Sequence, residues 1–78
     1  MWHVYLLECS DKTFYTGITN NLKKRIQSHQ AGKASRYTRG RLPVRLVYEE
    51  PCRSRGNALR REFRIKQWPR AKKQDLIP

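Results

Sequence analysis

Two tyrosines, Tyr5 and Tyr15, each lie in a short run of strand-forming residues, and a polar turn separates the two runs. A phenol with a cation beside it has a pKa below the usual value of about 10, and it can then serve as a general base. A two-residue turn would place the two side chains on opposite faces of a hairpin, whereas a three-residue loop or a bulge places them on one face. We predict the shared face, with a loop of residues 11–13 that sets Cys9 opposite Tyr15.

A second pair of polar residues, Arg25 and His29, lies four residues apart in the helix predicted over residues 22–30. Leu22 and Ile26 set the buried stripe of that helix, and the pair falls on its flank. A guanidinium can contact a phosphate through its planar donors, and an imidazole can orient or share a proton. The structural alternative is an arginine at the edge of the stripe and a histidine with satisfied hydrogen bonds.

A single carboxylate, Glu62, falls within the apolar arc of a second helix, which is predicted to begin after Ser54 and to end near Trp68. A carboxylate on a buried face is costly unless it is paired or binds a metal ion. Glu62 is therefore either a metal ligand or the partner of one of the many arginines. The apolar residues predicted on the same arc are Ala58, Leu59, Phe63 and Ile65, and the opposite side carries Arg60, Arg61, Arg64 and Gln67.

The chain has 78 residues, with 18 Lys and Arg against 6 acids and a formal net charge of +12. This length predicts one small domain with a shallow groove, and the charge favours a polyanion, above all nucleic acid, as the partner. An anionic membrane surface is the alternative, but no segment reaches the ~20 apolar residues of a span. We expect no signal peptide before the first strand. Cys9 and Cys52 lack metal-ligand spacing and are expected to be reduced thiols of a cytoplasmic protein.

A basic segment, residues 33–42, combines four cationic side chains with one aromatic ring and no acid. It is predicted to be a surface loop, and its composition suits phosphate contact and base stacking, with a solvated basic loop as the alternative. Gly17, late in the second strand, marks a place where a ligand or backbone approaches closely. The predicted nucleic-acid contacts are Gly17, Lys33, Arg36, Tyr37, Arg39 and Arg41.

The remaining patterns complete an α/β (α+β) domain, in which a small three-stranded antiparallel sheet is flanked by helices. Residues 43–50 alternate as a third strand, which Pro51 is predicted to end. Val44, Leu46 and Tyr48 would share one side of that strand. Residues 70–77 are predicted to form a short last helix.

The order and spacing of the polar residues resembles the GIY-YIG nuclease superfamily over nearly the whole chain, residues 4–77. The two tripeptides that name that family read HVY at residues 3–5 and YTG at residues 15–17. The segments YTGITNNLKKRIQSH, YTRGRLPVRLVY and ALRREFRIK look most like its small stand-alone bacterial members. The resemblance implies a metal-dependent DNA endonuclease in which Glu62 binds a single Mg²⁺ or Mn²⁺. The catalytic residues that it implies are Tyr5, Tyr15, Arg25 and His29.

Two positions depart from the family pattern. His3 stands where the first motif has glycine, and no asparagine follows Asn57, so that Gln74 is the nearest substitute for the asparagine that often follows the metal glutamate. A nucleic-acid-binding module without turnover is therefore an alternative function, and a small ribosome-associated RNA binder would need only the charge. A domain of this size is expected to take its specificity from a protein partner or from the shape of the substrate.

Overall fold

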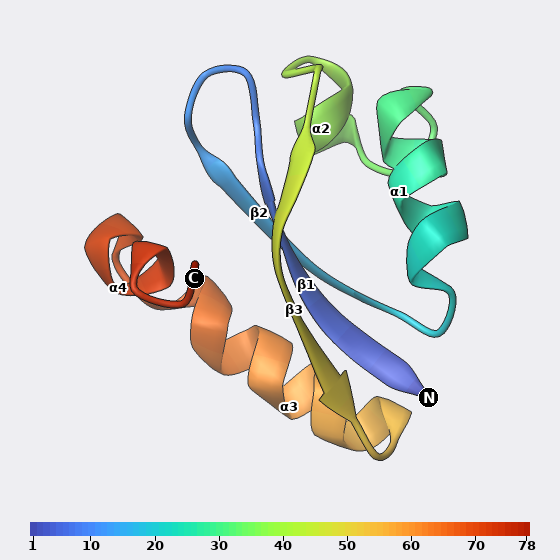
Figure 1. Ribbon diagram of the computed structural model, residues 1–78, viewed down its shortest axis with the longest axis vertical. Coiled ribbons are helices and arrows are strands. Elements are labelled where there is room, and N and C mark those ends of the chain that lie inside the picture. Colours follow the sequence, from blue (N-terminus) through green and yellow to red (C-terminus); the bar gives the residue numbers. More distant parts are fainter.

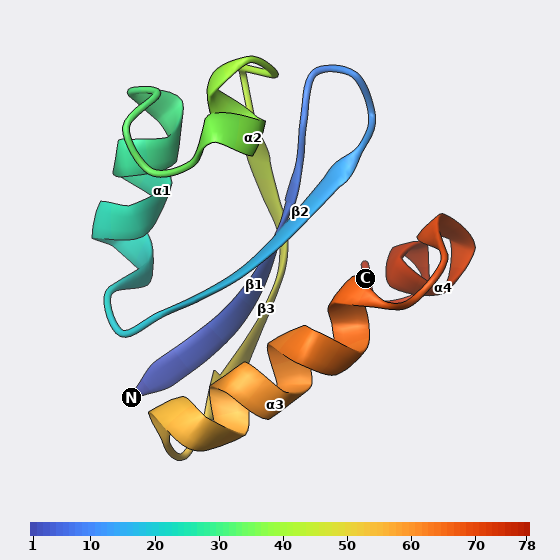
Figure 2. The same cartoon turned by 180° about the vertical axis from the view of Figure 1, so that it is seen from behind.

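The computed structural model describes residues 1–78 and forms a three-stranded antiparallel sheet with helices on both faces (Figure 1). The strand order is β2-β1-β3, so β1 is central and both neighbours are edge strands. Helices α1 and α2 lie on one side of the sheet and α3 and α4 on the other, as the reverse view also shows (Figure 2). The elements in chain order are β1 (Trp2–Glu8), β2 (Phe14–Thr19), α1 (Leu22–Gln30), α2 (Arg36–Arg39), β3 (Arg45–Cys52), α3 (Arg55–Lys66) and α4 (Arg70–Gln74).

The β1–β2 hairpin places both tyrosines on one face of the sheet, as predicted, but its pairing differs from the prediction by two residues. Tyr15 lies opposite Leu7 and not opposite Cys9. The loop consists of residues 10–12, because the Cys9 N–H donates to the Thr13 carbonyl at 2.9 Å and Lys12 takes the left-handed conformation, with φ 70°. A shift of two residues preserves the alternation of side chains, so the tyrosines still share a face.

Each face of the sheet has its own hydrophobic core, because apolar residues occupy both sides of β1. The face toward α3 and α4 buries Val4, Leu6, Ala58 and Ile65, and the face toward α1 and α2 buries Tyr5, Leu7, Cys9 and Val44. The tyrosines therefore lie between the sheet and α1, whereas α3 packs against the opposite face of the sheet.

Strand β3 departs from the simple alternation that its sequence predicts. A bulge between the partners of Leu6 and Leu7 leaves Val47 as an extra residue, so Tyr48 faces the α3 side while Leu46 faces the other. The shared side predicted for Val44, Leu46 and Tyr48 is thus wrong. Pro51 also does not end the strand, which continues to Cys52, because a proline is tolerated on an edge strand.

The helix boundaries follow local capping residues. The Asn21 side chain accepts from the Lys24 N–H at the start of α1, and Gly32, with φ +75°, follows its end. Ser54 caps α3 in the same way. The predicted loop at residues 33–42 contains the one-turn helix α2, which Ser35 caps, and α4 ends at Gln74 instead of residue 77.

The apolar arc of α3 is narrower than its sequence predicts. Ala58 and Ile65 are buried, but Leu59 is 38% exposed and Phe63 58% exposed. A sheet of three strands presents a narrow surface, so only one stripe of the helix contacts it. Arg61 lies partly inside that stripe, and its Nε is 2.9 Å from a carboxylate oxygen of Glu50 on β3. No helix is long and apolar enough to cross a membrane.

Candidate active site

The centre of the site is a buried contact between β1 and α1. The Tyr5 hydroxyl lies 2.8 Å from Nε2 of His29, and neither residue is exposed to solvent. Tyr5 reaches this position by crossing over β2 at Gly17, its partner in the hairpin register. A Cβ atom at Gly17 would lie 2.5 Å from the Tyr5 hydroxyl oxygen, closer than real Cβ atoms come to another atom. The glycine is therefore required by the tyrosine itself, and a ligand contact at Gly17 remains a prediction.

A chain of hydrogen bonds continues from His29 into α2. Nδ1 of His29 lies 2.9 Å from the hydroxyl of Thr38, and that hydroxyl donates to the Ser35 carbonyl at 3.3 Å. Because the Thr38 hydrogen is used in this way, its oxygen accepts from the N–H of Nδ1. Nε2 is then the free acceptor of the neutral ring, and the Tyr5 O–H donates to it. The direction of all three bonds follows from the threonine.

Sequence reasoning missed this role of Thr38, which is fully buried. A signal was present, since Ser35 is a good N-cap residue and predicts a helical turn after it. Such a turn directs the residue three positions later back toward the preceding carbonyl. It also encloses Thr38 between α2 and α1, where only a partner with a free polar atom, such as His29, suits its hydroxyl.

Tyr15 occupies the more open side of the same cluster. Its ring centroid lies 6.3 Å from that of Tyr5, 5.0 Å from that of His29 and 6.1 Å from that of Tyr37. Edge-to-face and tilted ring pairs at these separations are favourable packing arrangements. Tyr15 thus connects the buried pair with the aromatic residue of the basic segment.

Burial controls the protonation of the central pair. It is the largest factor that raises the pKa of Tyr5, followed by the nearby Tyr15, and it is also the main cause that lowers the pKa of His29. The guanidinium of Arg25 lowers both values, so it acts on both groups. The sequence predicted that Arg25 would lower the tyrosine pKa. Its effect has this direction, but burial outweighs it, and Tyr5 is a neutral phenol at neutral pH.

Glu62 lies on α3, which packs on the opposite side of the sheet from α1 (Figure 1). Its side chain is 17% exposed, and its Oε2 lies 3.4 Å from Nζ of Lys66, one turn along the helix. The structural alternative of an ion pair is therefore present in the structure, but its partner is an exposed lysine and not an arginine. The carboxylate is near enough to contribute to the raised pKa of Tyr5.

The donor set around Glu62 suits a loosely held divalent ion. No group of three or more His, Cys, Asp or Glu side chains is placed to enclose a metal. Mg²⁺ commonly binds through one or two carboxylates, substrate phosphates and several waters. A single carboxylate can fit that pattern, and it does not fit a structural metal site.

A groove opens beside Tyr15 at the edge of the sheet formed by β2. It has a volume of about 370 Å³, and no acidic residue lines it. The helices on both sides of the sheet contribute to its walls. Its lining residues are Phe14, Tyr15, Thr16, Tyr37, Lys66 and Lys73.

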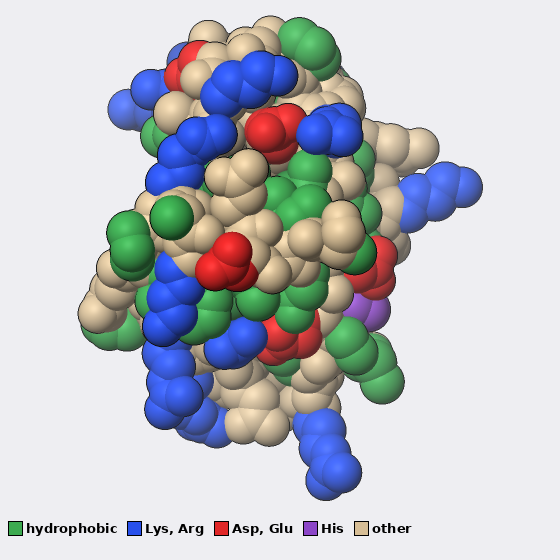
Figure 3. Space-filling view, turned by 60° about the vertical axis from the view of Figure 1, so that its left-hand side comes forward, with side chains coloured by type: hydrophobic (Ala, Val, Ile, Leu, Met, Phe, Trp, Pro, Cys, Tyr) green, Lys and Arg blue, Asp and Glu red, His purple; other side chains and the backbone are tan.

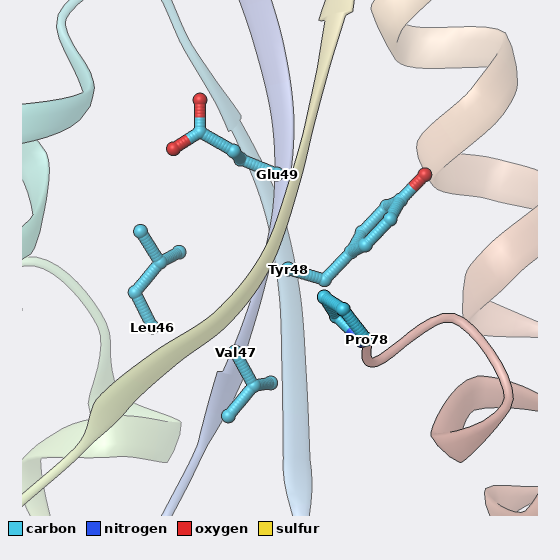
Figure 4. Close-up of a pocket in the computed structure, with 5 residues that line it drawn as sticks. All are labelled: Leu46, Val47, Tyr48, Glu49 and Pro78. Carbon is cyan, nitrogen blue, oxygen red and sulfur yellow. The ribbon is translucent and has the colours of Figure 1, made fainter.

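Another hollow, of about 330 Å³, lies at the β3 edge and contains none of the tyrosine cluster (Figure 4). In this view Tyr48 and Pro78 lie on one side of β3, and Leu46 and Glu49 on the other. Because β3 and β2 are on opposite edges of the sheet, this hollow is not part of the candidate site.

The cationic residues predicted to contact nucleic acid differ in whether other side chains hold them in place. Lys33, Arg36 and Arg39 are exposed around α2. Arg41 is held in place: its Nε lies 3.0 Å from Asp11, and its guanidinium carbon lies 4.0 Å from the ring centre of Tyr37. Elsewhere on the surface, Lys and Arg side chains run down one side of the face in Figure 3 and also project at its other edges, whereas the acidic side chains are separated from one another.

The chain is similar in sequence and fold to known proteins. Residues 1–75 match the model of the GIY-YIG catalytic domain. The chain is 51% identical to a UPF0213 protein of Halobacterium salinarum, covering 99% of this chain and 100% of that protein. It is 49% identical to a UPF0213 protein of Desulfotalea psychrophila, covering 97% and 70%. The solution NMR structure of a UPF0213 protein from Bacillus halodurans is similar, with a TM-score of 0.61 and 44% identity over 97% of this chain and 82% of that one.

Proposed function

Because the chain belongs to the GIY-YIG catalytic domain family, we propose that it is an endonuclease that hydrolyses phosphodiester bonds in DNA with the help of one divalent metal ion. The observation that carries this proposal is the buried hydrogen-bond chain from Tyr5 through His29 to Thr38. It ends beside a cationic groove that contains no acid. Hydrolysis needs a proton acceptor, a phosphate ligand and a place for the strand, and these groups can supply all three.

The proton acceptor is His29, acting through Tyr5. At neutral pH the imidazole is neutral, because burial lowers its pKa, and its Nε2 faces the Tyr5 hydroxyl. As the attacking water bonds to phosphorus, Tyr5 takes a proton from that water and passes its own proton to Nε2. The bond from phosphorus to the leaving oxygen breaks, and that oxygen takes a proton from solvent. The Thr38 hydroxyl keeps the imidazolium oriented throughout.

Arg25 is the residue that meets the phosphate. It is exposed on α1, and its charge acts on the pKa values of both Tyr5 and His29. The Tyr5 hydroxyl is closed to solvent in the free protein. Movement of the guanidinium onto a phosphate oxygen would satisfy its planar donors and open the hydroxyl to the attacking water. Tyr15, on the open side of the cluster, would orient that water.

The divalent ion would be held by Glu62, with waters and phosphate oxygens as its other ligands. When bound, it would polarise the phosphate and stabilise the charge that develops on the leaving oxygen. Mg²⁺ and Mn²⁺ both prefer such oxygen ligands. The ammonium group of Lys66, 3.4 Å from the carboxylate, places a single positive charge near the position that the ion would take.

A nucleic-acid-binding module without turnover is the second candidate function. The burial of the Tyr5 hydroxyl favours it, because a catalytic group must meet its substrate. The two functions differ in their need for metal. A binder would hold DNA equally well in EDTA and would never cleave it, whereas the endonuclease requires the ion.

The deciding experiment is a cleavage screen of linear and branched DNAs, with RNA for comparison, in Mg²⁺, Mn²⁺ or EDTA. We expect metal-dependent DNA cleavage, which Glu62→Gln abolishes. Loss of the ion pair with the exposed Lys66, one turn along the helix, costs only about 0.5 kcal/mol, so the melting temperature should hardly change.

The matched control is Glu49→Gln, which removes the same charge from the far edge strand and should leave cleavage intact. A Glu62→Gln protein that cleaves normally but melts much earlier would show that the carboxylate is structural. Absence of cleavage of every substrate by the wild-type protein, with binding retained, would instead support the binding module.

A further inference from the structure

We propose that the groove beside Tyr15 binds one unpaired nucleobase, so that the preferred substrate has a single-stranded nucleotide next to the bond that is cut. This inference rests on the proposed endonuclease function and names its substrate class. It concerns the groove of about 370 Å³ at the β2 edge. That volume lies within the range of small-ligand sites, about 300–1,000 Å³.

The lining of the groove has the chemistry of a nucleotide site. Phe14 and Tyr15 come from β2 and Tyr37 from α2, which provides aromatic rings on two sides. Lys66 of α3 and Lys73 of α4 add two ammonium groups to the lining. Aromatic rings stack on any base, lysines attract the flanking phosphates, and the absence of a carboxylate removes repulsion.

Cations hold the aromatic rings in place before any ligand arrives. The guanidinium of Arg41 lies 4.0 Å from the ring centre of Tyr37 and is itself fixed by Asp11 and by the Tyr37 carbonyl. Arg70 lies 5.2 Å from the ring centre of Phe14. Tyr37 nevertheless remains 37% exposed, so ring surface is available to a base. A site ordered in advance loses less entropy on binding.

The groove is continuous with the candidate active site through Tyr15. The Tyr15 ring lines the groove and also lies 5.0 Å, centre to centre, from the ring of His29. A base in the groove would therefore belong to a nucleotide adjacent to the phosphate bound by Arg25. A base within a duplex is stacked and paired, so it cannot enter a pocket unless it is flipped out or already unpaired. Flaps, overhangs and other single-stranded junctions meet this requirement without cost.

The test measures binding in EDTA, so that no cleavage occurs, with three DNAs of the same length and charge. One is a plain duplex, one carries an unpaired nucleotide at a junction, and one carries an abasic residue at that unpaired position. We expect the wild-type protein to bind the junction about tenfold more tightly than its abasic version. Tyr37→Leu keeps an apolar side chain but removes the ring, and it should bind the two junctions about equally.

Phe63→Leu is the matched control, because Phe63 is an exposed aromatic residue on the outer side of α3, away from the groove. It should keep the full difference between the two junctions. Equal binding of both junctions by the wild-type protein, or a difference that persists in Tyr37→Leu, would overturn the base site and leave the endonuclease proposal standing. Failure to bind any of the three DNAs would also overturn the base site, and the cleavage screen in Mg²⁺ or Mn²⁺ decides the endonuclease proposal separately.

Discussion

The Tyr5 hydroxyl and Nε2 of His29 lie 2.8 Å apart, and both side chains are completely buried. This contact joins the central strand to α1, and it depends on one small residue and one polar residue elsewhere in the chain. Gly17 leaves the space through which the phenol passes, and Thr38 holds the other nitrogen of the ring. The predictions below test those dependences.

Thr38 should act as a positioning residue for His29. Thr38→Val has nearly the same shape but removes the acceptor for the Nδ1 hydrogen, so the ring can place its hydrogen on Nε2 and lose the bond from Tyr5. We expect cleavage at neutral pH to fall at least about tenfold, with an altered pH–rate profile. Thr38→Ser keeps the hydroxyl and should restore both. A Thr38→Val enzyme with the wild-type rate and profile would exclude this role.

Gly17 should tolerate no side chain. In Gly17→Ala the added carbon would lie 2.5 Å from the Tyr5 hydroxyl, so the phenol must move, at a cost of about 1–3 kcal/mol. In a domain of this size that corresponds to a fall in melting temperature of roughly 4–24 °C, together with loss of cleavage. The control is Gly40→Ala, because nothing lies within 4 Å of the added atom there. Thermal unfolding of both variants decides the matter, and equal melting temperatures would contradict the close approach.

The stability of the protein should fall as the pH drops below about 6.5. Burial lowers the pKa of His29 in the folded state, so the unfolded chain takes up a proton first. The free energy of unfolding is therefore highest above the unfolded pKa and decreases, by up to about 1.4 kcal/mol per pH unit, as the pH falls toward the folded value. Urea unfolding at pH 7.5, 6.5 and 5.5 measures this slope.

Two variants assign that slope. His29→Asn should be less stable at pH 7.5 but nearly insensitive to pH over this range, because the titrating group is gone. His3→Gln removes the only other histidine and should retain the wild-type dependence. The acidic groups with lowered pKa values, Glu8 and Asp11, act at lower pH and do not overlap with this range. A slope that survives in His29→Asn would contradict the assignment.

Binding of DNA should depend steeply on salt. With a net charge of +12, several lysines and arginines are expected to neutralise phosphates, and each contact contributes about −0.9 to the slope of log K against log salt. Single substitutions of the exposed Lys33, Arg36 or Arg39 by Gln should each reduce the slope by about one if they make these contacts. Fluorescence anisotropy measures this slope when binding is titrated at salt concentrations from about 50 to about 200 mM. A flat dependence would exclude nucleic acid as the partner.

Local signals in the sequence predicted much of the site. Strand-forming runs around Tyr5 and Tyr15, with an odd loop between them, were enough to place both phenols on one face, since only parity matters. The helical spacing of Arg25 and His29 predicted that both side chains point inward, but only His29 is buried, and Arg25 is exposed. The family resemblance, confirmed by the match over residues 1–75, follows from the same few residues.

The errors arose where a neighbouring element changed a regular pattern. The pairing partner of Tyr15 depended on which residue of the loop adopted positive φ, and Lys12 did so. The alternation of β3 was broken at Val47 by a bulge that only its pairing with β1 reveals. On α3, hydrophobic periodicity predicted burial for Leu59 and Phe63, but the narrow sheet covers only one stripe.

By itself, then, the sequence determined the fold class, the shared face of the two tyrosines and the basic charge, because each depends on local periodicity or composition. Only the tertiary structure decided the protonation of Tyr5 and His29, the direction of the bond between them and the role of Thr38. These properties depend on burial and on partners that lie 9 and 24 residues away in the chain. Desolvation and hydrogen-bond direction arise when distant segments pack together, and no spacing within one element encodes them.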